Sequence, residues 1–167
     1  VKDVDGIFPL DPAKTRRVLL VDGGIVHPLI PHALKFVLPE LLRKEGFEIT
    51  LDRPDIVPSP EDFDLVLYTL GDESLLVRGR IFIDWHRIGG GGLFKAMYRP
   101  WTNIPAAMIS LGHPYHLYDA PRVPAYINAY STMDSVQEAV VDCMMGRRPF
   151  AGTNPVDPFC GLEDARY

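Results

Sequence analysis

The chain contains the run Arg17-Val18-Leu19-Leu20-Val21-Asp22-Gly23-Gly24, in which a continuous apolar stretch ends at a pair of glycines. A strand with one solvent-exposed face alternates apolar and polar residues, whereas a strand buried on both faces of a parallel sheet is apolar throughout. The run therefore predicts a central strand of a parallel sheet. Residues 64–70, closed by Gly71, and residues 104–111, closed by Gly112, repeat the pattern.

Segments with the apolar periodicity of a helix lie between and after these strands. Apolar residues recur every three or four positions over residues 28–45, where Pro39 must kink the helix or start a second segment. A better-defined helix is predicted over residues 131–144, because Ser131 and Asp134 have the spacing of a capping box and the apolar residues that follow share one helical face.

The order of the elements defines the fold class. Apolar and alternating patterns predict two more strands over residues 47–51 and 123–130, while residues 80–85 fit a strand or the start of a helix. Strands that alternate with helices predict an α/β fold, a mostly parallel sheet flanked by helices on both faces. This is a three-layer α/β/α sandwich of the flavodoxin or Rossmann-like kind. We expect an extended lead-in over residues 1–15 and one domain over residues 16–167.

Composition excludes several classes of protein. The 167 residues are 47% hydrophobic and 23% charged, which suits a single folded domain. The net charge of −5 and the absence of a basic stripe argue against nucleic-acid binding. The apolar runs fall far short of the ~20 residues that cross a bilayer. The chain begins with Val1 and shows no signal-peptide pattern, so we expect a piece of a longer protein.

Metal and cofactor sites are not expected. His113 and His116 are three residues apart, but no third ligand lies in their segment, and a rigid turn after a strand explains both rings better. Cys143 and Cys160 have no metal-binding spacing, and we expect no disulfide between them. Neither phosphate-binding glycine motif is present, so no nucleotide cofactor is expected.

Acidic and aromatic residues offer candidate chemistry. Asp72 and Glu73 follow a predicted strand, where a carboxyl group can enter a crevice and act as a general acid if burial raises its pKa, although solvated loop acids explain them better. Trp85, Trp101 and Tyr98 could stack on a sugar, but their apolar neighbours favour an interior or interface role.

Four segments in order carry a resemblance to a known family. They are PLDP (residues 9–12), ISLGHPYHL (109–117), INAYS (127–131) and MGRRPFAGTNPV (145–156). Together they resemble the C-terminal domain of glycoside hydrolase family 3, in which a G-x-P-Y-x-L turn, a strand ending in Tyr, a helix and an l-x-G-x-x-x-x-G-x-x-P-V segment follow one another. The resemblance covers nearly the whole chain and is weakest over residues 75–99.

The resemblance implies a parent enzyme that hydrolyses β-linked sugars, of the β-N-acetylhexosaminidase or β-glucosidase type. Its N-terminal (β/α)8 barrel would supply the nucleophilic aspartate of a retaining mechanism and bind the carbohydrate. In the β-N-acetylhexosaminidase branch, which the GHPYHL form most resembles, the acid/base also comes from a barrel loop and the second domain mainly packs against the barrel. In the β-glucosidase branch the second domain adds a glutamate, for which Glu73 is the candidate acid/base, active only with the barrel present. Asp72 and His113 are the candidate substrate-binding residues. The isolated chain is expected to be inactive.

Two alternatives remain. The chain could be a freestanding flavodoxin-like module that binds a small ligand at the strand ends, or a structural module that stabilises or oligomerises its neighbour. A large exposed apolar patch favours a missing partner domain, because monomers rarely expose more than several hundred Å² of contiguous apolar surface.

Overall fold

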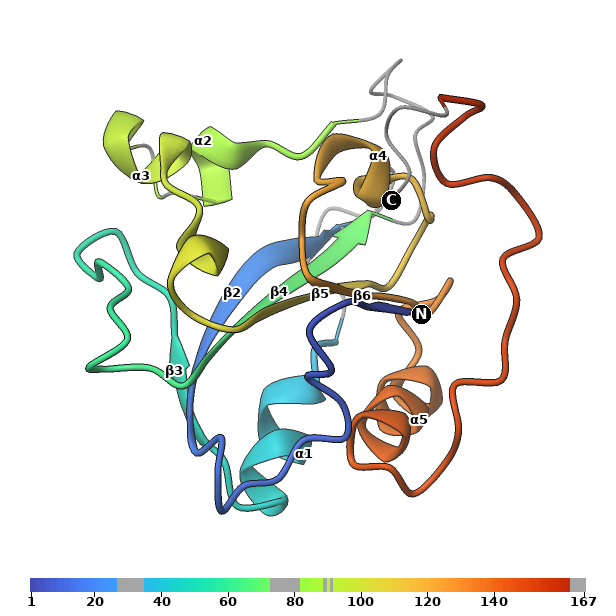
Figure 1. The fold of residues 1–167 in the computed structure, drawn as a ribbon, viewed down its shortest axis with the longest axis horizontal. Coiled ribbons are helices and arrows are strands. Elements are labelled where there is room, and N and C mark those ends of the chain that lie inside the picture. The colour runs from blue at the N-terminus through green and yellow to red at the C-terminus, as the bar shows by residue number, and fades with distance from the viewer. Residues whose placement is uncertain (27–34, 73–81, 89, 91, 163–167) are drawn as a thin grey trace.

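The computed structural model of the chain describes residues 1–26, 35–72, 82–88, 90 and 92–162 (Figure 1). Within these ranges the centre is a six-stranded sheet in the order β1-β6-β5-β4-β2-β3. Its strands are β1 (Lys2–Asp3), β2 (Arg17–Val26), β3 (Glu48–Leu51), β4 (Leu65–Asp72), β5 (Ala106–Ser110) and β6 (Ala125–Asn128). Every neighbouring pair is parallel except β1 with β6, which confirms the mostly parallel sheet.

Helices lie on both faces of the sheet, as predicted. In Figure 1, α1 (Leu38–Lys44) and α5 (Asp134–Met144) lie below the sheet. Above it lie α2 (Trp85–Ile88), α3 (Leu93–Met97), the 3-10 turn η1 (Pro100–Thr102) and α4 (His116–Asp119). The three-layer α/β/α architecture is therefore confirmed.

The apolar run of β2 is buried on both faces, for the reason that the sequence suggested. Val18 and Leu20 join the core cluster that includes residues of α1 and α5. Leu19 and Val21 join the cluster on the opposite face of the sheet. All four side chains are 4% exposed or less, so an alternating polar pattern would have placed polar groups in one of the two cores.

The helix predicted over residues 28–45 begins later than its periodicity suggests. Residues 27–34 lie outside the described part, and residues 35–37 are not helical. Pro39 lies in the first turn of α1, where its missing N–H group needs no partner. Pro39 therefore starts a helical segment, the second of the two options that its position left open.

The predicted capping box at the start of α5 is wrong. Met133 is the N-cap residue, and no side chain caps it. Ser131 Oγ instead accepts a hydrogen bond from the Met133 N–H at 3.3 Å, and the Asp134 carboxylate pairs with Lys35. The helix begins too late for Ser131 to cap it.

The sequence left residues 80–85 as a strand or the start of a helix. Residues 82–84 are irregular and α2 begins at Trp85, which fits the start of a helix.

The N-terminal segment packs against the domain. Lys2 and Asp3 pair with β6, and the Asp3 carboxylate accepts hydrogen bonds from the N–H groups of Ile7 and Phe8. Leu10 is 5% exposed, and its N–H donates to the Met144 carbonyl at 2.7 Å. The boundary between a lead-in and a domain at residue 15 stays a prediction.

The described residues contain no helix that is long and apolar enough to cross a bilayer. Both cysteines are free thiols, Cys143 in α5 and Cys160 on the surface. Burial raises the pKa of the Cys143 thiol above its ordinary value, so this thiol is protonated at neutral pH.

Asp64 ties the start of β2 to the segment before β4, and its stabilising effect depends on pH. Its carboxylate accepts hydrogen bonds from the N–H groups of Arg16 and Arg17 at 2.9 and 2.8 Å, and from Arg17 Nη2 at 2.6 Å. These bonds, chiefly those from Arg17, lower the pKa of Asp64 from 3.8 to about 2. Because the folded pKa is depressed, the stabilisation is present above about pH 4 and is lost as the pH falls through 2.

We expect Asp64→Asn to lower the free energy of unfolding by about 1 kcal/mol at pH 7, a value discounted because Arg17 is partly exposed. The deficit should shrink as the pH falls from 4 and approach zero below pH 2, where the wild-type carboxyl group becomes protonated. Urea titrations across this pH range measure the difference, with Asp55→Asn as the control, because Asp55 is 73% exposed. A deficit that does not change with pH would show that the carboxylate charge is not responsible.

Candidate functional site

The carboxyl ends of the central strands meet at one edge of the sheet. Ser110 of β5 is in register with Leu70 of β4 on one side and with Asn128 of β6 on the other. The Leu111 N–H donates to the Leu70 carbonyl at 2.7 Å, and the Ala129 N–H donates to the Ser110 carbonyl at 2.8 Å. The segments that follow these three strands therefore begin side by side, as expected at the ligand-binding edge of a parallel sheet.

The structure describes only some of the site residues that were predicted from the sequence. Asp72 ends β4, where its backbone is in register with Val26, but its side chain lies outside the described part. Glu73 also lies outside the described residues. His113 lies in the turn after β5 and is partly buried. The roles of Asp72, Glu73 and His113 stay predictions.

A hydrogen-bond network fixes the turn that carries His113. The Ser110 hydroxyl donates to the His113 carbonyl at 2.6 Å, and Ser110 Oγ lies 2.8 Å from His116 Nδ1. A carbonyl only accepts, so the hydroxyl proton lies on the His113 side and the network assigns the Nδ1–H donor to His116. Tyr126 completes the network by donating from its hydroxyl to the Pro114 carbonyl at 3.0 Å.

This network makes the serine and histidine structural. Ser110 and His116 are both 0% exposed, and a nucleophilic serine would need to donate its proton to the imidazole. The His113 ring lies tilted against the His116 ring, with 4.2 Å between centroids, and stacks on Tyr115 at 5.8 Å. Its Nδ1 accepts a hydrogen bond from the Tyr115 N–H at 3.2 Å. The expected rigid turn is confirmed. Within the described ranges, no three His, Cys, Asp or Glu side chains gather as a metal site.

A polar cluster at the end of β6 is the part of the edge that the sequence did not predict. Asn154 Oδ1 accepts hydrogen bonds from the Tyr130 hydroxyl at 2.8 Å and from Asn128 Nδ2 at 3.0 Å. Tyr130 has a φ of +61°, a strained conformation for a bulky residue. Asn128 Oδ1 is buried and has no hydrogen-bond partner among the described residues. A cavity of about 420 Å³ opens beside the cluster, against α5 and residues 149–154.

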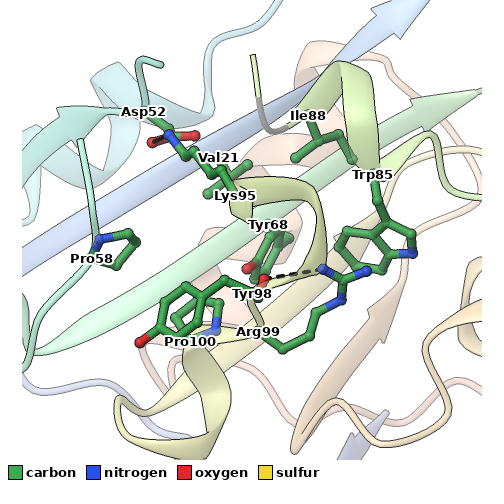
Figure 2. A pocket seen from close by; sticks show the side chains of 10 residues that line it. All are labelled: Val21, Asp52, Pro58, Tyr68, Trp85, Ile88, Lys95, Tyr98, Arg99 and Pro100. Carbon is green, nitrogen blue, oxygen red and sulfur yellow. Dashed lines mark hydrogen bonds and ion pairs between the residues drawn. The ribbon is translucent and has the colours of Figure 1, made fainter. Parts of the chain in front are cut away.

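A second crevice lies on the other face of the sheet, between the sheet and the α2–α3 segment (Figure 2). The rings of Tyr68, Trp85 and Trp101 meet edge to face at 5.8 to 6.0 Å. Both tryptophans are partly buried and pack against the buried core of this face, which agrees with the predicted interior or interface role. Tyr98 lies at the surface, 36% exposed. Arg99 places its guanidinium 3.7 Å from the centre of the Trp85 ring.

Comparisons with known proteins give the chain its relatives. No protein-family model matches it. A β-N-acetylglucosaminidase/β-glucosidase of Cellulomonas fimi is 30% identical over 98% of this chain and 31% of its own length. The structure of β-glucoside phosphorylase BglX is 31% identical over 99% of this chain and 30% of its own, with a TM-score of 0.78. A glycoside hydrolase family 3 β-N-acetylglucosaminidase from Paenibacillus sp. str. FPU-7 shares the fold, with 14% identity over 88% of this chain and 28% of its own and a TM-score of 0.55.

The chain corresponds to the C-terminal region of glycoside hydrolase family 3 enzymes. The family resemblance stated from the sequence is thereby confirmed, and so is the α/β fold that it implied. The chain spans about a third of the length of the family 3 relatives that it matches.

Proposed function

We propose that this chain is the supporting C-terminal domain of a longer enzyme that cleaves a β-glycosidic bond, with the catalytic nucleophile on an N-terminal (β/α)8 barrel. The observation that carries the proposal is the coverage: the matches run over 98–99% of this chain but only 30–31% of the relatives. The names of these relatives, a β-N-acetylglucosaminidase/β-glucosidase and a β-glucoside phosphorylase, support a β-glucoside or an N-acetyl-β-glucosaminide as the substrate.

In this proposal the strand-end edge faces the barrel. A retaining enzyme places its two carboxyl groups about 5–5.5 Å apart, so a second-domain residue acts only when the domains are assembled. Glu73 is the proposed acid/base, and Asp72 and His113 are the proposed contacts to the sugar. Their support is their position in the sequence, at the end of β4 or shortly after the ends of β4 and β5, two strands that end side by side.

Phosphorolysis is a second candidate reaction. It is favoured by the name of the β-glucoside phosphorylase, which is 31% identical over 99% of this chain. In phosphorolysis, inorganic phosphate replaces water as the acceptor of the sugar, so the product is a sugar phosphate rather than a free sugar.

Assays on p-nitrophenyl β-glucoside and p-nitrophenyl N-acetyl-β-glucosaminide test both candidates. The longer protein should release nitrophenol, and the isolated chain should stay at background. Clear cleavage by the isolated chain would contradict a supporting role. A rate that rises with phosphate, together with a sugar phosphate product, would identify a phosphorylase. In the longer protein, unchanged turnover of Glu73→Gln would remove Glu73 from the site, with Glu138→Gln on the exposed side of α5 as the control.

A further inference from the structure

The outer edge of β6 is covered by β1 along only part of its length (Figure 1). β1 runs antiparallel to β6, with Lys2 opposite Tyr126. Continued backward, this register places Val1 opposite Ile127 and the residue before Val1 opposite Asn128. Any residues that precede Val1 in the same strand therefore lie toward the carboxyl end of β6, at the strand-end edge of the sheet.

The backbone of Asn128 faces the uncovered part of this edge. The backbone groups of successive strand residues point to opposite sides, and the Ala129 N–H donates to the Ser110 carbonyl of β5 at 2.8 Å. The N–H and carbonyl of Asn128 therefore point away from β5, to the side along which β1 lies. Within the described residues the ladder with β1 ends before it reaches them. An unpaired strand edge is a template for another stretch of strand.

Two cavities flank the uncovered edge, one on each face of the sheet. The first is the cavity of about 420 Å³ on the α5 side, where Ala139 is among the α5 residues that line it. The second has a volume of about 310 Å³ and is lined by Leu117 of α4, on the opposite face. Val1 and Asn128 border both cavities. The two hollows therefore lie on either side of the path that β1 would follow if it were longer.

We propose that, in the longer enzyme, the residues directly before Val1 extend β1 along β6, pair with Asn128 and fill both cavities. Side chains alternate between the faces of a strand, so the residue before Val1 points to the α4 side and the residue before that points to the α5 side. The α5-side cavity is bordered by Val140 and Phe150, so it accepts an apolar side chain.

This inference rests on the proposed function, in which a catalytic domain precedes Val1, and it deepens that proposal. The added strand runs toward the carboxyl ends of the parallel strands, because β1 is antiparallel to β6. It therefore brings the preceding domain to the strand-end edge, where Asp72 and His113 are the proposed contacts to the sugar. The occupant of the two cavities is a segment of the same polypeptide.

Hydrogen exchange of the backbone amides, resolved residue by residue, tests the proposal. In the longer protein the Asn128 N–H should exchange at least about 100-fold more slowly than in a chain that begins at Val1, because the added residue accepts its hydrogen bond. The Ala129 N–H is the internal reference, since its bond to the Ser110 carbonyl is present in both proteins. It should be protected to a similar extent in both.

A variant that fills the α5-side cavity tests the same strand within the longer protein alone. Ala139→Trp places an indole ring where the added side chain lies, so exchange of the Asn128 N–H should accelerate about 10-fold or more. Glu138→Trp is the matched control, because Glu138 is the adjacent residue of α5 and is exposed. It should leave the exchange rate unchanged.

Equal exchange of the Asn128 N–H in the longer protein and in the chain that begins at Val1 would overturn the proposal, as would unchanged protection in Ala139→Trp. Cleavage of the p-nitrophenyl glycosides is measured separately on the same longer protein. If that protein cleaves them and leaves Asn128 unprotected, this inference fails and the proposed function stands. If it protects Asn128 and cleaves neither substrate, the added strand stands and the proposed function fails.

Discussion

Replacing Gln137 with methionine is expected to lower the free energy of unfolding by about 3–5 kcal/mol, the sum of several lost hydrogen bonds in a buried setting. Gln137 is 0% exposed and uses its whole amide group. Oε1 accepts from the N–H groups of Val37 and Leu38 at 3.0 and 3.1 Å. Nε2 donates to the carbonyls of Lys35 and Thr132 at 3.1 and 2.8 Å.

The physical reason is that Gln137 caps a helix to which it does not belong. The first N–H groups of a helix have no partner within the helix, and no side chain of the N-cap residue Val37 supplies one for α1. The Gln137 amide supplies it from α5, about 100 residues along the chain. Methionine fills the same volume but leaves these N–H groups and two carbonyls without partners.

Urea unfolding followed by circular dichroism measures the loss. Glu138→Met is the matched control, because Glu138 is the next residue along and is exposed, so its stability should stay within about 0.5 kcal/mol of wild type. Gln137→Glu keeps the acceptor oxygen and loses the donors, so its free energy of unfolding should lie between those of Gln137→Met and Glu138→Met. A loss below about 1 kcal/mol for Gln137→Met would mean that water satisfies the start of α1 and that the network does not join the helices.

This network also explains why the sequence predicted the strands better than the helix starts. The strands carry their signal in their own residues, because burial on both faces demands a continuous apolar run such as that of β2. The start of α1 depends on Gln137, which no local pattern connects to it. The capping box failed for a related reason, since Asp134 pairs with Lys35, another residue far away along the chain.

The same distinction holds for the candidate site. The His113 turn was predictable because its partners, Ser110 and His116, lie within seven residues. The contacts of Asn154 with Asn128 and Tyr130 link positions 24 to 26 residues apart. All three lie in segments that carry the family resemblance, but nothing in those segments indicates that these side chains meet. The crevice at Arg99 depends on Tyr68, some 30 residues earlier, and the sequence gives no sign that the two meet.

Ser110→Ala should destabilise the fold by about 2–3 kcal/mol, because it removes the hydroxyl that serves two buried partners. The His113 carbonyl loses its donor, and the His116 Nδ1–H loses its acceptor in a position that is 0% exposed. The apolar volume lost is negligible, so the cost is almost wholly that of unsatisfied polar groups. The turn that carries His113 should also become less ordered.

Two measurements separate these effects. Urea unfolding gives the free energy, with Ser135→Ala on the exposed side of α5 as the control, where alanine should be neutral or slightly stabilising. Proton NMR then follows the His116 Nδ1–H, which should exchange slowly with water in the wild-type chain and rapidly in Ser110→Ala. If the Nδ1–H stays protected in the variant, His116 has found another acceptor, and the serine does not hold the turn.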